Sequence, residues 1–235
     1  MKGAVRGHMV AWDLFSFVGV MAYAASGAVV AIEEQYDMFG VCVLGFVTSF
    51  GGGILRNVVV GIPLKSFWSQ TSMFLAAFGT LVAILLLPTR WLLHGKRWIV
   101  VFDAIGLSAF AIQGALYAKQ MHYPLIAVVM AAVLTGIGGG LIRDVLAGRK
   151  PFVLREEIYA VWAMLAGLVI GLGWVDGRHP VRLYVLFAAI FALRLLSVWR
   201  NWHIPRKPFR TPRLAGRPQP AASAEGEIHG RPGSV

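Results

Sequence analysis

Long apolar runs, separated by short polar segments, dominate the pattern of the chain. A membrane-spanning α-helix needs about 20 consecutive apolar residues, and the runs here reach that length. We therefore predict an all-α integral membrane protein with seven transmembrane helices. The predicted spans cover residues 12–32, 38–60, 67–88, 98–118, 123–147, 157–175 and 181–199.

The composition agrees with a membrane protein. Of the 235 residues, 57% are hydrophobic and only 14% are charged, and the mean hydropathy is +0.68, which is more apolar than a soluble core requires. The net charge of +11 would suggest nucleic-acid binding in a soluble protein. Here most cations lie in loops and in the tail, so we expect no nucleic-acid partner. Cys42 is the single cysteine, which excludes an intramolecular disulfide.

The cations between the runs predict the orientation. The loops after the first, third and fifth spans, together with the tail, hold clusters such as Arg149, Lys150 and Arg155. By the positive-inside rule, the C-terminus is cytoplasmic and the N-terminus lies outside. Lys2 and Arg6, followed by an apolar stretch and AYAASGA, also resemble a signal peptide. The apolar run continues to residue 32, which favours a membrane span.

Two stretches, TSFGGGILRN from Thr48 and TGIGGGLIRD from Thr135, are 87 residues apart. The same offset aligns further pairs: Arg56 with Arg143, Asn57 with Asp144, Gly61 with Gly148, Gly19 with Gly106 and Gly27 with Gly114. Each copy carries three predicted spans, and a unit with an odd number of spans inserts its copy upside down. We therefore predict an inverted repeat, with units at residues 12–94 and 98–175, followed by a seventh helix at 181–200.

The glycine triplets interrupt the second and fifth spans. Each glycine costs about 1 kcal/mol of helix propensity relative to alanine, so we expect the helices to be unwound or kinked there. Unwound backbone at membrane depth must face protein or a water-filled cavity, where carbonyl and hydroxyl oxygens can coordinate a cation. Close helix packing is the alternative role of such glycines. The candidate pore residues are Thr48, Ser49, Gly51, Gly52, Gly53, Thr135, Gly138, Gly139 and Gly140.

One arginine follows each triplet by about one helical turn. A central arginine costs about 2.5–3.5 kcal/mol on insertion scales, so Arg56 and Arg143 should face protein or water, unless they extend to the membrane interface. Adjacent helical residues point to different faces, so we expect Asp144 to pair with another helix rather than with Arg143. Asp103 is a candidate partner for either arginine. With Asn57, these residues form a predicted gating or charge network.

The sequence offers little for catalysis. GIGGGLIRD has the glycines of a phosphate-binding loop, but neither the preceding strand nor the lysine that completes one. No serine or cysteine is paired with a convincing base. The histidines, all in predicted loops or termini and without metal-ligand spacing, are His8, His94, His122, His179, His203 and His229. We expect no enzyme activity, no cofactor and no metal site.

Residues 201–235 are rich in Pro, Arg, Gly and Ala, and they carry too little apolar surface to fold. We predict a disordered, basic, cytoplasmic tail. Its cations can attract anionic lipid headgroups, although a role in topology alone explains them equally well.

The doubled Thr-x-x-Gly-Gly-Gly-x-x-Arg motif is followed by Asn in the first copy and by Asp in the second, with Ser-Gly before the first copy and Gly-x-x-Pro after the second. It resembles the prokaryotic trimeric intracellular cation (TRIC) channel family, UPF0126-like proteins of which some are described as glycine transporters. The resemblance covers residues 12–200. It implies a homotrimer in an inner (plasma) membrane, with one pore per protomer lined by the second and fifth helices, conducting K⁺ and Na⁺. It also implies that the triplets are the kinks, and that Thr48, Ser49 and Thr135 supply pore oxygens.

The chain departs from the family pattern in its first repeat. Asn57 stands where the motif has Asp, and Ser16 aligns with Asp103, so this half carries fewer buried acids. Cation selectivity would then depend more on oxygen dipoles than on carboxylates. The alternative function is a secondary transporter for glycine or another small amino acid, whose carboxylate would meet the broken helices, Arg56 or Arg143.

Overall fold

The computed structural model describes residues 2–61, 68, 70–87, 95–155, 158–177, 179–200 and 202. The described elements are all helices. Their bounds are α1 Lys2–Glu33, α2 Met38–Val60, α4 Thr71–Leu86, α6 Gly95–Gln120, α7 Leu125–Leu146, α8 Phe152–Arg155, α9 Tyr159–Gly171 and α10 Pro180–Trp199. Apart from Trp202, the predicted basic tail lies outside the described residues.

Among the described residues, five helices are long and apolar enough to cross a membrane, and they match five of the predicted spans. They are Trp12–Glu33, Met38–Val60, Arg97–Gln120, Leu125–Leu146 and Pro180–Trp199. The predicted spans at 67–88 and 157–175 contain the shorter apolar helices α4 and α9. α1 begins at Lys2, about ten residues before its predicted span, so His8, which was expected in a loop or terminus, lies in this helix.

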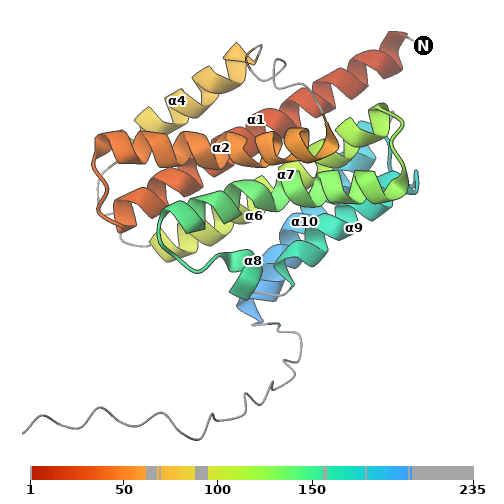
Figure 1. Ribbon diagram of the computed structural model, residues 1–235. Coiled ribbons are helices and arrows are strands. Elements are labelled where there is room, and N and C mark those ends of the chain that lie inside the picture. The colour runs from red at the N-terminus through yellow and green to blue at the C-terminus, as the bar shows by residue number, and fades with distance from the viewer. Residues whose placement is uncertain are drawn as a thin grey trace, which may run out of the picture. The chain divides into compact units, whose positions relative to one another are not determined.

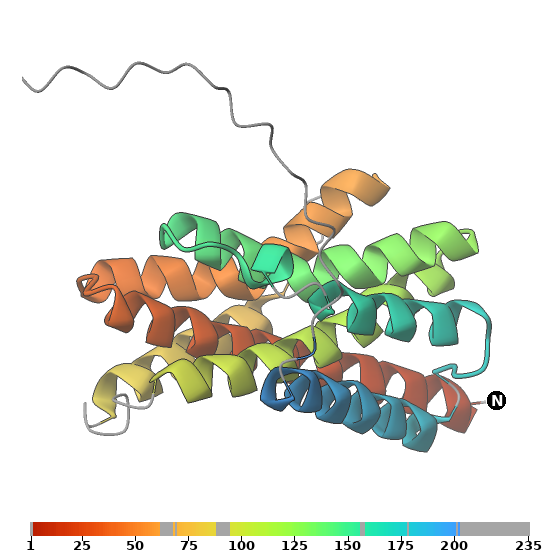
Figure 2. The same ribbon diagram turned by 90° about the horizontal axis from the view of Figure 1, so that it is seen from below.

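The helices pack as a bundle around α1, α6 and α7 (Figure 1). α7 contacts α2, α6 and α9, and α1 contacts α2, α4 and α6. α10 lies beside the N-terminal part of α1 (Figure 2), where Phe15 packs against Tyr184 and Phe187 at ring distances of 5.8 and 5.7 Å. α1 is thus part of the folded core, which argues against a cleaved signal peptide.

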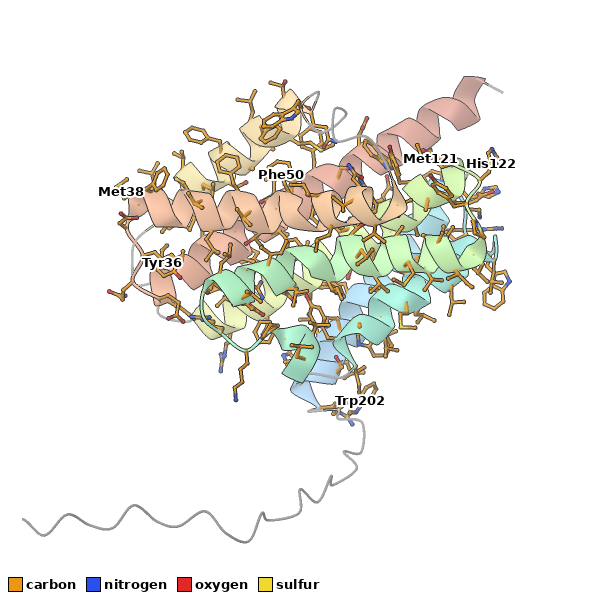
Figure 3. The ribbon with its side chains drawn as sticks, in the orientation of Figure 1. Tyr36, Met38, Phe50, Met121, His122 and Trp202 are labelled. Carbon is orange, nitrogen blue, oxygen red and sulfur yellow. The ribbon has the colours of Figure 1, made fainter. Side chains whose placement is uncertain are left out.

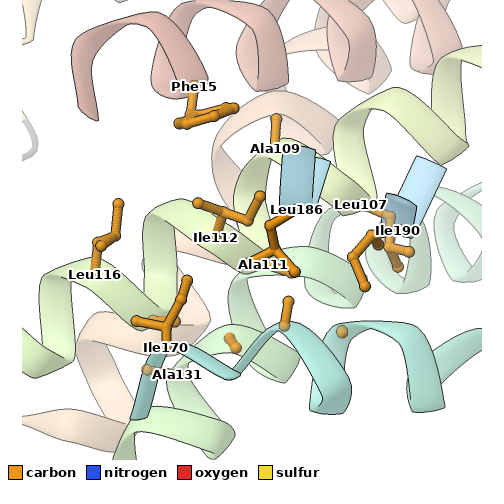
Figure 4. Close-up of a cluster of buried hydrophobic side chains, with 14 of the residues drawn as sticks. Phe15, Leu107, Ala109, Ala111, Ile112, Leu116, Ala131, Ile170, Leu186 and Ile190 are labelled. Carbon is orange, nitrogen blue, oxygen red and sulfur yellow. The ribbon is translucent and has the colours of Figure 1, made fainter. Parts of the chain in front are cut away.

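Two apolar clusters hold the bundle together. One joins α1, α6, α7, α9 and α10, and Figure 4 shows Phe15, Leu107, Ile112, Ile170 and Ile190 within it. The other joins α1, α2 and α4 with parts of α6. Many members of both clusters are alanines, whose small side chains let helices approach closely.

The turns that follow α1 and α6 have the same construction. Gln35 and His122, which are 87 residues apart, both have positive φ angles, of 60° and 57°. The Tyr36 hydroxyl donates a hydrogen bond to the carbonyl of Leu146 (3.0 Å), and the Tyr123 hydroxyl donates to the carbonyl of Val60 (3.4 Å). Each turn therefore contacts the end of the helix from the other half, and Figure 3 shows Tyr36 and His122 at opposite ends of the bundle.

Candidate functional site

The glycine triplets lie where α2 and α7 cross. A Cβ atom added to Gly52 would collide with the carbonyl oxygen of Thr135, and one added to Gly139 would collide with that of Thr48. The two contacts are equivalent in the repeat, because the offset of 87 residues relates Gly52 to Gly139 and Thr48 to Thr135. The glycines are required here because the backbones of the two helices touch.

The helices are not broken at the triplets, so the prediction of unwound backbone was wrong. α2 is continuous from Met38 to Val60, and α7 from Leu125 to Leu146. The packing of the two helices against each other stabilises the helical conformation that the glycines disfavour. The carbonyl groups beside the triplets thus remain within helices, and the packing role of the glycines is the one that the structure supports.

The predicted pore hydroxyls are buried next to this crossing. The Thr48 hydroxyl donates to the carbonyl of Leu44, and the Thr135 hydroxyl to the carbonyl of Ala131, both at 2.6 Å. Ser49 donates within its own helix to Gly45 (2.8 Å). Because their hydrogens are committed to helix carbonyls, these hydroxyls present oxygen lone pairs to any further partner.

Arg143 is fully buried in an ionic cluster. Its Nη1 donates to Asp103 Oδ1 on α6 (3.0 Å) and to the hydroxyl of Ser26 on α1. Its Nε donates to Asp144 Oδ1 (2.8 Å), and the other oxygen of Asp144 accepts from the backbone N–H of Phe152 (3.0 Å). Two carboxylates therefore compensate one buried guanidinium.

The last glycine of the second triplet borders this ionic cluster. A Cβ atom on Gly140 would lie 3.1 Å from both Asp103 Oδ1 and the Tyr159 hydroxyl. Tyr159 comes from α9, so the cluster joins α1, α6, α7 and α9. Gly140 thus permits the close approach of a carboxylate and a phenol from two other helices.

Arg56 is buried among neutral groups. Its Nε and Nη2 donate to Asn57 Oδ1 at 3.1 and 2.9 Å, and its Nη1 donates to Gln113 Oε1 at 3.0 Å. The guanidinium stacks over the ring of Tyr117, 4.6 Å from its centroid. Within the described part of the chain, no carboxylate lies within ion-pair distance of Arg56.

These contacts test the predicted charge network. Asp103 was predicted to pair with either Arg56 or Arg143, and it pairs with Arg143. The expectation that Asp144 would avoid its neighbour was wrong, because the long Arg143 side chain folds back to reach it. Neither arginine extends to the interface, since Arg56 is 6% exposed and Arg143 is 0% exposed.

Sequence reasoning missed Ser26 and Gln113, which bind the two arginines. The two residues are 87 positions apart and each precedes an aligned glycine, Gly27 or Gly114. The offset of 87 residues therefore already related Ser26 to Gln113 in the sequence. Tyr159 lies on α9 and had no corresponding signal, because only its packing brings it to Asp103.

Two separate cavities flank the helix crossing. One, of about 40 Å³, is lined by Ser16, Ser49, Gly53, Arg56, Asn57, Gln113 and Thr135 among others. The second, of about 530 Å³, lies at the end of α1 and α7 and is lined by Glu33, Glu34, Asp144, Arg149 and Lys150 among others. Arg149 forms ion pairs with Glu33 (2.9 Å) and Glu34 in this second cavity, which we call the charged mouth.

The fold and the site define a multi-pass helical membrane protein with buried polar clusters on both sides of a glycine-mediated helix crossing. The family model described as glycine transporter matches the chain twice, over residues 13–88 and 100–174. The chain belongs to the UPF0126 family of membrane proteins, the prokaryotic TRIC-type family that its doubled motif resembles.

Three relatives illustrate the similarity. The UPF0126 membrane protein YvgT of Bacillus subtilis (strain 168) is 52% identical over 201 residues, covering 86% of this chain and 98% of the relative. A crystal structure of a prokaryotic TRIC channel in 0.5 M KCl has a TM-score of 0.73 and 33% identity, covering 83% of this chain and all of the other. The TRIC trimeric intracellular cation channel orthologue from Rhodobacter sphaeroides has a TM-score of 0.70 and 29% identity, covering 81% and 98%.

Proposed function

We propose that this protein is a homotrimeric, passive channel for monovalent cations such as K⁺, with one pore per protomer along α2 and α7. The observation that carries the proposal is the similarity to solved prokaryotic TRIC channels over more than four fifths of the chain. The trimer is supported by the orthologue that is described as trimeric. The tail would face the cytoplasm of a prokaryotic inner membrane, where it can contact anionic lipid.

The proposed architecture is two inverted three-helix units and a final helix, so that α4 and α9 complete seven spans. It is supported by features that exchange under the offset of 87 residues. Gly19 packs on the ring of Phe110 and Gly106 on that of Tyr23, and Gly61 and Gly148 both have positive φ angles at the ends of α2 and α7. The two matches of the family model have the same spacing.

The proposed ion path runs from the charged mouth at Glu33 and Glu34 past the α2–α7 crossing to the cavity at Ser49 and Thr135. Serine and threonine oxygens there can replace part of the hydration shell of a cation. Direct backbone contact between Gly52 and Thr135 and between Gly139 and Thr48 leaves no space between α2 and α7 at this point of the proposed path. We therefore propose the glycine crossing as the gate, which opens when α2 and α7 move apart.

The alternative is a secondary transporter for glycine or another small amino acid. The description of the family model favours it, and Arg56 and Arg143 are cations that can hold a carboxylate. Arg143, however, is already neutralised by Asp103 and Asp144. A transporter would therefore have to use Arg56.

The deciding experiment is a planar bilayer recording with the purified protein under a KCl gradient, with and without glycine on one side. Unitary currents that reverse near the K⁺ equilibrium potential, unchanged by glycine, are the expected result. Electrically silent protein that accumulates labelled glycine in proteoliposomes would instead establish the transporter. Light scattering of the purified protein, corrected for detergent, tests the trimer separately.

A further inference from the structure

Arg56 and Arg143 occupy equivalent positions, but only Arg143 has acidic partners. Asp144 and Asp103, which neutralise Arg143, align with Asn57 and Ser16 beside Arg56. Arg56 is nevertheless buried, with only 6% of its surface exposed. Burying a guanidinium that carboxylates do not compensate is unfavourable in a low-dielectric interior. This half of the molecule therefore has a place for a negative charge that the described residues do not supply.

The two amides around Arg56 are oriented by it. A guanidinium has only hydrogen-bond donors, so the Asn57 and Gln113 side chains must direct their oxygens toward Arg56, as they do at 2.9–3.1 Å. Their NH₂ groups consequently point elsewhere. Arg56 uses three of its five N–H groups in these bonds, so it keeps further donors as well.

A cavity adjoins these donors. Arg56, Asn57 and Gln113 all line the cavity of about 40 Å³, together with Ser16, Ser49 and Thr135 among others. One water molecule needs about 10–15 Å³ of cavity volume, so the cavity admits a single ion with a water molecule. The volume is too small for an amino acid with its own hydration.

We propose that the cavity at Arg56 binds a small monovalent anion of halide size, which serves as the counter-ion of Arg56. The positive charge, the surplus N–H groups of the guanidinium and the amide NH₂ groups all favour an anion next to Arg56, in the cavity that the proposed ion path also enters. The anion would neutralise the charge of Arg56, as Asp103 and Asp144 neutralise that of Arg143. It would also remove an unfavourable positive charge from the neighbourhood of a cation path.

The anion site shares this cavity with the proposed ion path, but the two proposals are tested separately, because binding can be measured without transport. The purified full-length protein is melted in detergent with sodium chloride, sodium bromide or sodium gluconate at equal ionic strength. Gluconate is too large for the cavity. We expect a higher melting temperature in the two halides, increasing with halide concentration as expected for a ligand of the folded state.

The variant Asn57→Asp supplies the missing charge from the chain itself. Asp144 shows that an acid at this position reaches the neighbouring arginine, at 2.8 Å. We expect the variant to lose the halide dependence of its melting temperature, and to melt in gluconate as high as the wild type melts in chloride. Gln113→Glu is a second variant with the same expectation, should the first fail to fold. Arg149→Gln, at the surface, should keep the halide dependence.

Crystals grown in bromide locate the ion directly. An anomalous peak beside Arg56 in the wild type, absent in Asn57→Asp, is the expected result. Equal halide dependence in wild type and both acidic variants would overturn the proposal. Electron density in the cavity without an anomalous signal would also overturn the proposal, because it would identify the bound species as water. A peak that appears without any halide effect on melting would indicate an adventitious ion only.

Discussion

Gly139 of α7 lies against the backbone carbonyl of Thr48 in α2, with no room for a Cβ atom between them. Gly52 and Thr135 repeat this relationship with the helices exchanged. Such backbone contact is typical of membrane helices that associate through small residues. In this protein it also places four buried polar residues, Thr48, Ser49, Thr135 and Asn57, within two turns of the crossing.

The neighbouring glycines allow a test of this contact. Gly139→Ala should lower the stability by about 1–3 kcal/mol, because the added methyl group overpacks the crossing. Gly53→Ala is the matched control, since a Cβ there meets nothing within 4 Å, and it should be neutral or stabilising by up to about 1 kcal/mol. Melting temperatures in detergent measure both. Equal effects of the two variants would show that the crossing is looser than the structure indicates.

Arg143 should be far more important for stability than an arginine at the surface. Arg143→Gln leaves Asp103 and Asp144 buried without their cation, and breaking a buried ion pair typically costs about 3–5 kcal/mol. Arg149→Gln removes an arginine that is 27% exposed and paired with Glu33 and Glu34, where the cost is about 0–1 kcal/mol. Yield of monodisperse protein and melting temperature distinguish the two. A mild effect of Arg143→Gln would mean that water reaches the cluster.

The residue pattern predicted the helices and the pairing of the halves better than it predicted the local geometry. Apolar run length identified five long helices, because a bilayer imposes that length on any spanning helix. The expectation of unwound backbone at the triplets was wrong because intrinsic helix propensity ignores packing, and here contact between α2 and α7 outweighs it. The Arg143–Asp144 pair was missed because spacing rules describe Cβ positions, whereas a long flexible side chain can turn back.

The cluster around Asp103 shows another limit of prediction from the sequence. The offset of 87 residues relates Asp103 to Ser16, so the repeat itself indicated that the two halves differ in charge. It did not indicate Tyr159 or Phe152, which reach the cluster from α9 and α8. Where the halves are not equivalent, only the packing reveals the partners.

The charged mouth should control conductance if the protein conducts cations. Arg149→Gln releases Glu33 and Glu34 and adds one net negative charge to the cavity of about 530 Å³. A unit charge about 10 Å away in water contributes about 0.4 kcal/mol, roughly a two-fold change in local cation concentration. We expect about that increase in unitary K⁺ current at low salt, and a decrease in the double variant Glu33→Gln with Glu34→Gln. Both effects should fade near 1 M salt, where screening acts over about 3 Å.

Met38, at the start of α2, and Met121, in the turn after α6, should lie on opposite sides of the membrane if the halves are inverted. Both side chains are exposed, at 71% and 46%, and Figure 3 shows them at opposite ends of the bundle. In a background that carries Cys42→Ser, Met38→Cys should react with an impermeant maleimide only after the cytoplasmic face is opened, whereas Met121→Cys should react in intact cells. Labelling of both from one side would contradict the inverted arrangement. Labelling of each from the face opposite to that expected would keep the inversion and reverse the predicted orientation of the termini.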